Sequence, residues 1–134
     1  MAAPERSSRT VLVADDDALV RSVLRMALAS RGHTVIEAAD APTTISAGRT
    51  HDVDLAILDI SMPGGDAAST LASLRDHRDD RPVLVLSGAA KLPPELAAAG
   101  VEFARKPIEL DDFLELVSAL LADGEPPNTA TPES

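Results

Sequence analysis

The sequence contains no cysteine, tryptophan or tyrosine, and its only aromatic side chains are Phe103 and Phe113. The absence of cysteine excludes a disulfide framework and a thiolate metal site, and it is compatible with a reducing compartment. Because 45% of the residues are apolar while aromatics are almost absent, we expect a core of Val, Leu, Ile and Ala. A chain of 134 residues is long enough to bury such a core in one domain, but too short for two.

Basic residues are also scarce, with 12 Lys and Arg against 22 Asp and Glu and a net charge of −10. A surface of this sign repels the phosphate backbone, so we expect no direct binding to nucleic acid. No apolar run is long enough to cross a bilayer, and residues 1–9 lack the apolar centre of a signal peptide. We therefore expect a soluble cytoplasmic protein with no membrane partner.

Short β-rich runs alternate with helical patterns along the whole chain, which is typical of βαβ units around a parallel sheet. The most regular helical pattern extends from Leu110 to Leu121, whereas Pro93 and Pro94 leave room for only a short fourth helix, ending near Ala99. The other helices are expected at about 19–28, 40–48 and 66–74. The strands are expected at residues 10–14, 34–38, 55–58, 83–86 and 101–104.

Five strands and five helices in strict alternation predict an α/β fold, a three-layer sandwich around a five-stranded parallel sheet. Right-handed crossovers leave the flavodoxin-like strand order 2-1-3-4-5 as the commonest compact solution. We place the folded domain at residues 10–122, after a flexible N-terminus at 1–9. The remaining residues, 123–134, offer nothing to bury and are expected to form a disordered tail.

Polar side chains stand where four of the five strands end, and in such folds ligands bind beyond the carboxyl ends of the strands. Taken singly, an Asp before a helix is most often a cap, an Asp before a Pro-Gly turn forms the turn, and a Ser or Lys is an ordinary loop residue. These explanations do not account for the convergence of all of them on one edge of the sheet. The residues are Asp15, Asp16, Asp17, Asp59, Ser87 and Lys106.

Crowded carboxylates repel one another and raise each other's pKa unless a cation neutralises them. Oxygen donors without His or Cys favour Mg²⁺, with Mn²⁺ as the alternative. A metal-bound carboxylate such as Asp59 can attack a phosphoryl group, and an ammonium and a hydroxyl then stabilise the charge on its oxygens. Lys106, one of two lysines against ten arginines, and Ser87 supply these two groups.

The sequence closely resembles the receiver domains of two-component response regulators, in four blocks at residues 11–17, 55–64, 83–89 and 103–107. The resemblance implies that Asp59 accepts a phosphoryl group from a sensor histidine kinase or a histidine phosphotransfer protein. It also implies a set of supporting roles. These are Asp15 and Asp16 as the acidic pair that organises Mg²⁺, the backbone carbonyl of Ser61 as a further metal ligand, Ser87 and Lys106 as phosphoryl contacts, and Phe103 as an aromatic switch.

The resemblance has further implications for this chain. It implies a cis peptide between Lys106 and Pro107 that aims the ammonium, and a path for hydrolytic water bordered by Ala89 and Ser61. Because no effector domain follows, we expect a single-domain regulator whose output goes through a downstream protein target, a homodimer or onward phosphotransfer. Such a protein promotes only its own phosphorylation and dephosphorylation, and is not an enzyme acting on other substrates.

Two other classes of protein are alternatives, and the first of them has the same fold. A pseudo-receiver binds partners without phosphorylation, but the intact set of Asp16, Asp59, Ser87 and Lys106 argues against it. A small phosphatase of the haloacid dehalogenase type also uses a strand-end Asp with Mg²⁺. Such enzymes usually carry a second Asp two residues after the nucleophile as general acid, and that position is Ser61 here.

Overall fold

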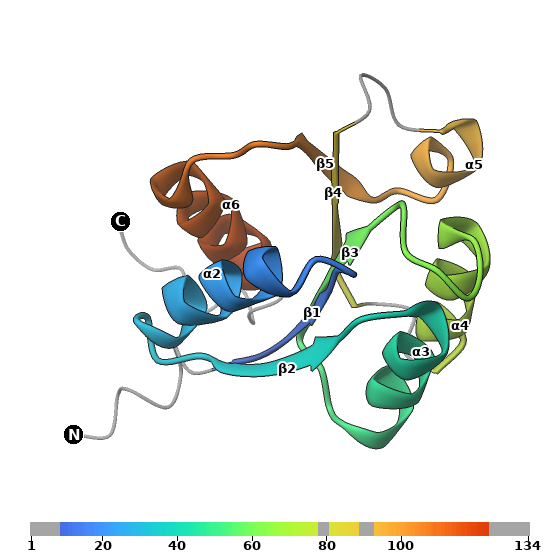
Figure 1. Cartoon of the computed structure of the whole chain (residues 1–134), viewed down its shortest axis with the longest axis horizontal. Coiled ribbons are helices and arrows are strands. Elements are labelled where there is room, and N and C mark those ends of the chain that lie inside the picture. The colour runs from blue at the N-terminus through green and yellow to red at the C-terminus, as the bar shows by residue number, and fades with distance from the viewer. Residues whose placement is uncertain (1–8, 78–80, 89–92, 124–134) are drawn as a thin grey trace.

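The computed structural model of the protein describes residues 9–77, 81–88 and 93–123 (Figure 1). Its sheet has five parallel strands in the order β2-β1-β3-β4-β5, which confirms the predicted topology. Two predicted ends are too early by one residue, because Asp59 and Ser87 are the last residues of their strands, and the fifth strand lies one residue later than predicted. The strands are β1 Thr10–Ala14, β2 Thr34–Ala38, β3 Leu55–Asp59, β4 Val83–Ser87 and β5 Glu102–Arg105.

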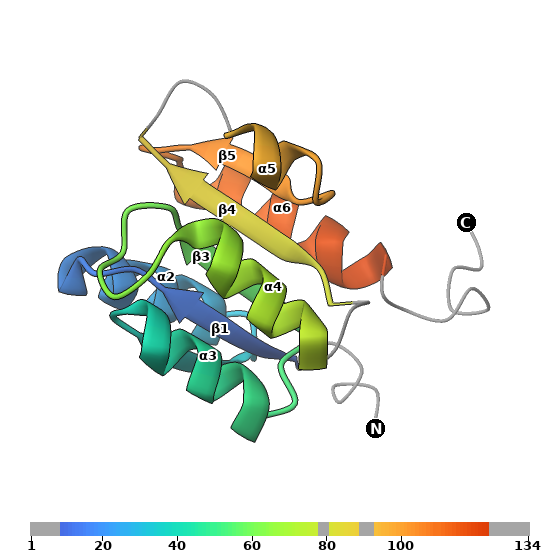
Figure 2. The ribbon, with the colours of Figure 1, turned by 90° about the vertical axis from the view of Figure 1, so that its right-hand side faces the viewer.

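Five helices in the described part of the chain cover the sheet, α2 and α6 on one face and α3, α4 and α5 on the other, which confirms the three-layer sandwich (Figures 1 and 2). The short fourth helix is also confirmed, since α5 has only four residues and starts behind Pro93 without a side-chain cap. No helix in this part of the chain has the length and apolar character needed to cross a bilayer. The helices are α2 Ala18–Ala29, α3 Ala41–Thr50, α4 Ala67–His77, α5 Pro94–Ala97 and α6 Leu110–Asp123.

The core is aliphatic, as predicted, and lies in two layers separated by the sheet. Alternate residues of β1 serve the two layers: Val11 and Val13 pack with α2 and α6, while Leu12 packs with α3, α4 and α5. Phe113 is the one fully buried aromatic among the described residues. Every residue of β3 and β4 is buried, because helices cover both faces of a parallel sheet.

Helix α3 runs to Thr50, two residues beyond the end predicted at Gly48. The glycine does not stop this helix; it allows close packing on α4. A Cβ at Gly48 would lie 2.4 Å from the Cδ2 of Leu74. The predicted end of α3 was therefore wrong, because Gly48 lies at the contact with α4 and does not terminate the helix.

The loop after β3 is held against the start of α3. The amide of Ala41 donates a hydrogen bond of 2.9 Å to the carbonyl of Pro63. Gly64 has a φ of +91°, and a Cβ there would lie 2.7 Å from the Cδ of Pro42. The turn predicted at Pro63 and Gly64 is therefore anchored beside the carboxyl ends of β1 and β3.

Most residues of the two predicted end segments, 1–9 and 123–134, lie outside the described residues. Arg9 and Asp123 are described: the first precedes β1, and the second is the last residue of α6. The predictions of a flexible N-terminus and a disordered tail stay predictions.

Candidate functional site

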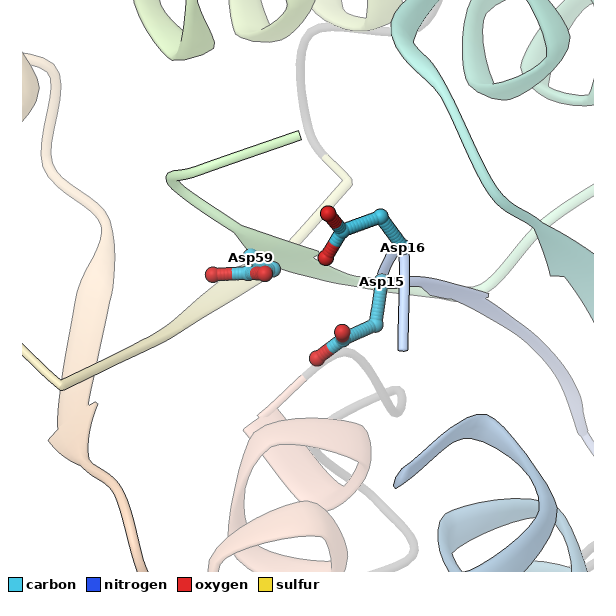
Figure 3. Close-up of side chains that lie close together, drawn as sticks. All are labelled: Asp15, Asp16 and Asp59. Carbon is cyan, nitrogen blue, oxygen red and sulfur yellow. The ribbon is translucent and has the colours of Figure 1, made fainter. Parts of the chain in front are cut away.

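Three carboxylates meet at the carboxyl ends of β1 and β3. Ala14 and Leu58 are partners in the β1–β3 ladder, so the next residues, Asp15 and Asp59, emerge side by side. One oxygen each of Asp15, Asp16 and Asp59 lies within 4.8 Å of the others, and Figure 3 shows the three side chains gathered at these strand ends. Asp15 is 2% exposed and Asp59 6%, whereas Asp16 is exposed to solvent.

Lys106 brings a positive charge to this cluster of carboxylates. Its Nζ lies 2.7 Å from Oδ2 of Asp15 and 3.5 Å from Oδ2 of Asp59. Its backbone amide donates a hydrogen bond of 2.8 Å to the carbonyl of Ser87, which ties the ends of β4 and β5 together. The peptide between Lys106 and Pro107 is cis, as predicted.

The electrostatics of the cluster favour added positive charge. Burial raises the pKa of Asp59, and the charges of Asp15 and Asp16 raise it further, against the opposing effects of the Ser61 amide and of Lys106. Burial alone would lower the pKa of Lys106, but its hydrogen bond to Asp15 and the charges of Asp59 and Asp15 outweigh burial and raise it. The ammonium of Lys106 contacts two of the three carboxylates, those of Asp15 and Asp59. The oxygen donors of the three carboxylates fit Mg²⁺ or Mn²⁺, which would relieve the remaining repulsion.

Among the other predicted site residues, Ser87 and Ser61 lie at or beside the carboxyl ends of the strands, and Phe103 lies within β5. Ser87 is 3% exposed and ends β4, one residue beyond the pairing of Leu86 with Asp59. The amide of Ser61 donates to Oδ1 of Asp59 at 3.3 Å, and its side chain is exposed. Phe103, on β5, is partly buried in the core layer of α3, α4 and α5. Ala89 lies outside the described residues.

The first helix contributes a residue that the sequence does not single out. Arg21 donates a hydrogen bond of 2.7 Å from Nη1 to the backbone carbonyl of Asp15. Asp17 acts as the N-cap of α2, accepting from the amides of Leu19 and Val20, so the cap explanation is correct for this third Asp. The contact of Arg21 joins a helix to a strand end, and no local pattern in the sequence indicates it.

The match to known proteins covers most of the chain. The family model described as the response regulator receiver domain matches residues 11–118. The chain is 34% identical over 120 residues to the DNA-binding transcriptional regulator NtrC of Rhizobium meliloti, covering 85% of this chain and 24% of NtrC. It is 31% identical over 127 residues to the transcriptional regulatory protein TcrA of Mycobacterium tuberculosis, covering 92% of this chain and 50% of TcrA.

The chain thus spans between a quarter and a half of the length of these two relatives. Among solved structures, the CheY-like receiver domain protein from Methanospirillum hungatei superposes with a TM-score of 0.83 at 24% identity, covering 87% of this chain and 96% of that one. This second likeness supports the fold, and the family match agrees with it over the same residues. The chain therefore belongs to the response regulator receiver domain family.

Proposed function

We propose that this chain accepts a phosphoryl group on Asp59 in a Mg²⁺-dependent reaction and transmits the signal through a surface that changes on phosphorylation. The observation that carries the proposal is the position of Lys106, whose ammonium contacts both Asp15 and Asp59 inside a cluster of three carboxylates. A buried acceptor, a cation beside it and an oxygen-only donor set are the parts that phosphoryl transfer to a carboxylate needs.

In the proposed transfer, a carboxylate oxygen of Asp59 attacks the phosphorus of a phosphorylated imidazole. A P–O bond forms as the P–N bond breaks, and the imidazole leaves neutral with the electron pair of that bond and a proton on its other nitrogen. The ammonium of Lys106 and the hydroxyl of Ser87 donate hydrogen bonds to the phosphoryl oxygens. Asp15, Asp16, Asp59 and the carbonyl of Ser61 would hold Mg²⁺. Bound Mg²⁺ supplies further neutralisation of the phosphoryl charge.

Receiver domains as a class take the phosphoryl group from histidine kinases, and the surface of α2 supports a protein donor here. Leu19, Val23 and Met26 are spaced at i, i+4 and i+7, and they are 72%, 40% and 63% exposed. This exposed apolar stripe begins at Leu19, three residues after the acidic pair ends at Asp16. A kinase or phosphotransfer protein could cover the stripe while presenting its histidine to Asp59.

Signal output is proposed to involve Ser87 and Phe103. Movement of Ser87 toward the phosphoryl group would displace Lys106 through the hydrogen bond between their backbones. The displacement would continue along β5 to Phe103. Ala89 and Ser61 are proposed to border the path of the hydrolytic water. The downstream target is proposed to be a protein or a second copy of the chain, because a net charge of −10 disfavours nucleic acid.

Incubation with acetyl phosphate and Mg²⁺, followed by intact-mass measurement, tests the proposal. We expect one phosphoryl adduct on the wild type, none without Mg²⁺, and none on Asp59→Asn. An adduct that persists in Asp59→Asn would assign the acceptor to another residue. No adduct on the folded wild type at saturating Mg²⁺ would reject phosphoacceptor function and favour the pseudo-receiver class.

A further inference from the structure

The backbone of the acidic pair lies just beyond the regular sheet. The ladders of β1 end at Ala14, which pairs with Ala38 on one side and Leu58 on the other. The amide of Asp15 still donates to the carbonyl of Ala38 at 3.0 Å. Its carbonyl lies past the last ladder pair and accepts a hydrogen bond from Arg21 at 2.7 Å. A guanidinium is a strong donor because the hydrogen bond is charge-assisted.

Arg21 is itself held by the neighbouring strand. Its Nε lies 3.2 Å from Oε1 of Glu37, and its side chain is only 18% exposed. Glu37 is on β2, where it pairs with Val13 of β1. The guanidinium therefore has two fixed contacts, one to the edge strand and one to the end of β1, and the planar fork of arginine suits this bridging geometry.

Arg25 provides a natural comparison on the same helix. Its Nε lies 3.0 Å from the other oxygen of Glu37, and its side chain is 45% exposed. Within the described residues Arg25 makes no hydrogen bond or ion pair with Asp15. The two arginines thus carry the same charge, lie on the same helix and bind the same partner, Glu37. Of the two, only Arg21 contacts the acidic pair.

The contact of Arg21 completes the fixing of Asp15. Oδ1 of Asp15 accepts from the amide of Asp17 at 2.9 Å, and Oδ2 accepts from Lys106 at 2.7 Å. With its carbonyl bound as well, the peptide plane that joins Asp15 to Asp16 has a fixed orientation. Asp16 is exposed, so the position of its carboxylate relative to Asp59 depends on this plane.

We propose that Arg21 is a positioning residue for the divalent-cation site: by holding the carbonyl of Asp15 it places Asp16 where it can bind the ion together with Asp59. The inference rests on the proposed function, because it assigns the cation to this cluster. It extends that function to a second layer of residues, Arg21 and Glu37, that orient the ligands without touching the ion.

Two effects of Arg21 on cation affinity have opposite signs, which makes the proposal decidable. The positive charge of Arg21 repels a divalent cation, so loss of this charge, considered by itself, would strengthen Mg²⁺ binding. Loss of positioning would weaken binding, by roughly tenfold for a residue that orients metal ligands. Arg25→Gln is the control for the charge effect, since it removes a positive charge one helical turn away and keeps the arginine that contacts the carbonyl of Asp15.

The experiment compares Arg21→Gln, Arg21→Lys and Arg25→Gln with the wild type. Mg²⁺ titration is followed by the amide NMR signals of Asp16 and Asp59, because the chain has no tryptophan to report binding. We expect Arg21→Gln to bind Mg²⁺ roughly tenfold more weakly, Arg21→Lys to lie between it and the wild type, and Arg25→Gln to bind at least as tightly as the wild type.

A second measurement needs no metal. In the metal-free protein the carbonyl ¹³C signal of Asp15 reports on its hydrogen bond, and we expect it to shift in Arg21→Gln but not in Arg25→Gln. The rate of phosphorylation by acetyl phosphate should fall in Arg21→Gln at limiting Mg²⁺ and recover at saturating Mg²⁺. A defect that leaves Mg²⁺ affinity unchanged would lower the rate at limiting and at saturating Mg²⁺ alike.

Equal or tighter Mg²⁺ binding by Arg21→Gln, matching Arg25→Gln, would overturn the proposal while leaving phosphorylation of Asp59 intact. Failure of the wild type to bind Mg²⁺ or to be phosphorylated would instead reject the proposed function itself. If Arg21→Gln does not fold, Arg21→Lys decides, because it keeps the charge and loses the two-point contact.

Discussion

Asp59 is a carboxyl group kept in a place that disfavours its charge. Its pKa is raised above the ordinary value, chiefly by burial and then by Asp15 and Asp16. A raised carboxyl pKa means that the folded state holds the proton more tightly than the unfolded state. Stability is therefore lost as the pH rises from the unfolded pKa through the folded one, and the loss persists at neutral pH.

This arrangement predicts that Asp59→Asn stabilises the protein at pH 7 without divalent ions. We expect the free energy of unfolding to rise by on the order of 1 kcal/mol, because the amide of Asn has the shape of the carboxylate but carries no charge that burial disfavours. Urea unfolding in the presence of a chelator measures it. Asp16→Asn is the matched control and should change stability less, since Asp16 is exposed. A less stable Asp59→Asn would show that Lys106 stabilises the charge more than burial opposes it.

The residues of the site differ in how far the sequence could predict them. Asp15, Asp16, Asp59, Ser87 and Lys106 are each adjacent to a strand end, so the strand positions and the sheet order were enough to bring them together. Arg21 could not be predicted in this way. Its contact depends on how α2 rotates onto β1 and on the charge of Glu37 in β2, and both are set by tertiary packing.

At the scale of the elements, the contact between α3 and α4 depends on Gly48. Alanine normally favours a helix over glycine by about 1 kcal/mol. A Cβ at this position would nevertheless lie 2.4 Å from Cδ2 of Leu74, a core side chain that is only 1% exposed. We expect Gly48→Ala to lower the free energy of unfolding by about 1–3 kcal/mol, as overpacking does.

Thermal unfolding followed by circular dichroism checks this prediction. Ser46→Ala, on an exposed position of the same helix, is the control and should leave the melting temperature nearly unchanged. A Gly48→Ala protein as stable as the wild type would mean that α3 and α4 separate easily. The same contact explains why a glycine in the sequence was a poor guide to the end of α3.

The junction of α2 and β2 contains the titratable group His33, whose Nδ1 accepts from the amide of Arg9 at 3.3 Å. Burial lowers the pKa of His33, as do the charges of Arg9 and Arg31, while Asp54 opposes them. The unfolded chain therefore binds the proton more readily than the folded one. Stability is fully present above the unfolded pKa of 6.5 and falls as the pH drops through it toward the folded pKa.

We therefore expect the free energy of unfolding of the wild type to fall between about pH 7.5 and about pH 5.5, and His33→Gln to show a smaller fall. Urea unfolding at both pH values measures the difference between the two proteins, and the comparison cancels the carboxylates that they share. A steeper loss in His33→Gln than in the wild type would contradict the lowered pKa.

At the scale of the whole molecule, the alternation of strands and helices was sufficient for the strand order and the two-sided cover of the sheet. The helix limits were less predictable, because the end of α3 depends on how Gly48 packs against α4. For the surface, the sequence predicted only the net charge of −10 and not where charged or apolar side chains gather. The exposed stripe of Leu19, Val23 and Met26 became visible once the position of α2 on the sheet was known.

Ser87 and β5 connect the acceptor site to one lateral edge of the sheet. The carbonyl of Ser87 accepts from the amide of Lys106 at 2.8 Å, and Phe103, three residues before Lys106, pairs with Val85 and packs into the core layer of α3, α4 and α5. We therefore expect a displacement of Ser87 toward a phosphoryl group on Asp59 to reach β5 through this backbone contact. We expect phosphorylation to shift a balance between two arrangements of Ser87 and Phe103. The shift can be no larger than the difference in the free energies with which the phosphoryl group interacts with the two arrangements.

Beryllium fluoride, which stands in for the phosphoryl group on Asp59, should perturb the amide NMR signals of Ser87 and of residues 102–106 far more than those of residues 34–36 in β2. These β2 residues are the internal control, because β2 lies at the opposite edge of the sheet. Phe103→Ala should retain the perturbation at Ser87 and reduce it across β5, since the side chain that responds to the movement of Ser87 is gone. Shifts restricted to the neighbours of Asp59, with β5 unchanged in the wild type, would mean that the site accepts a phosphoryl group without transmitting a signal along this edge.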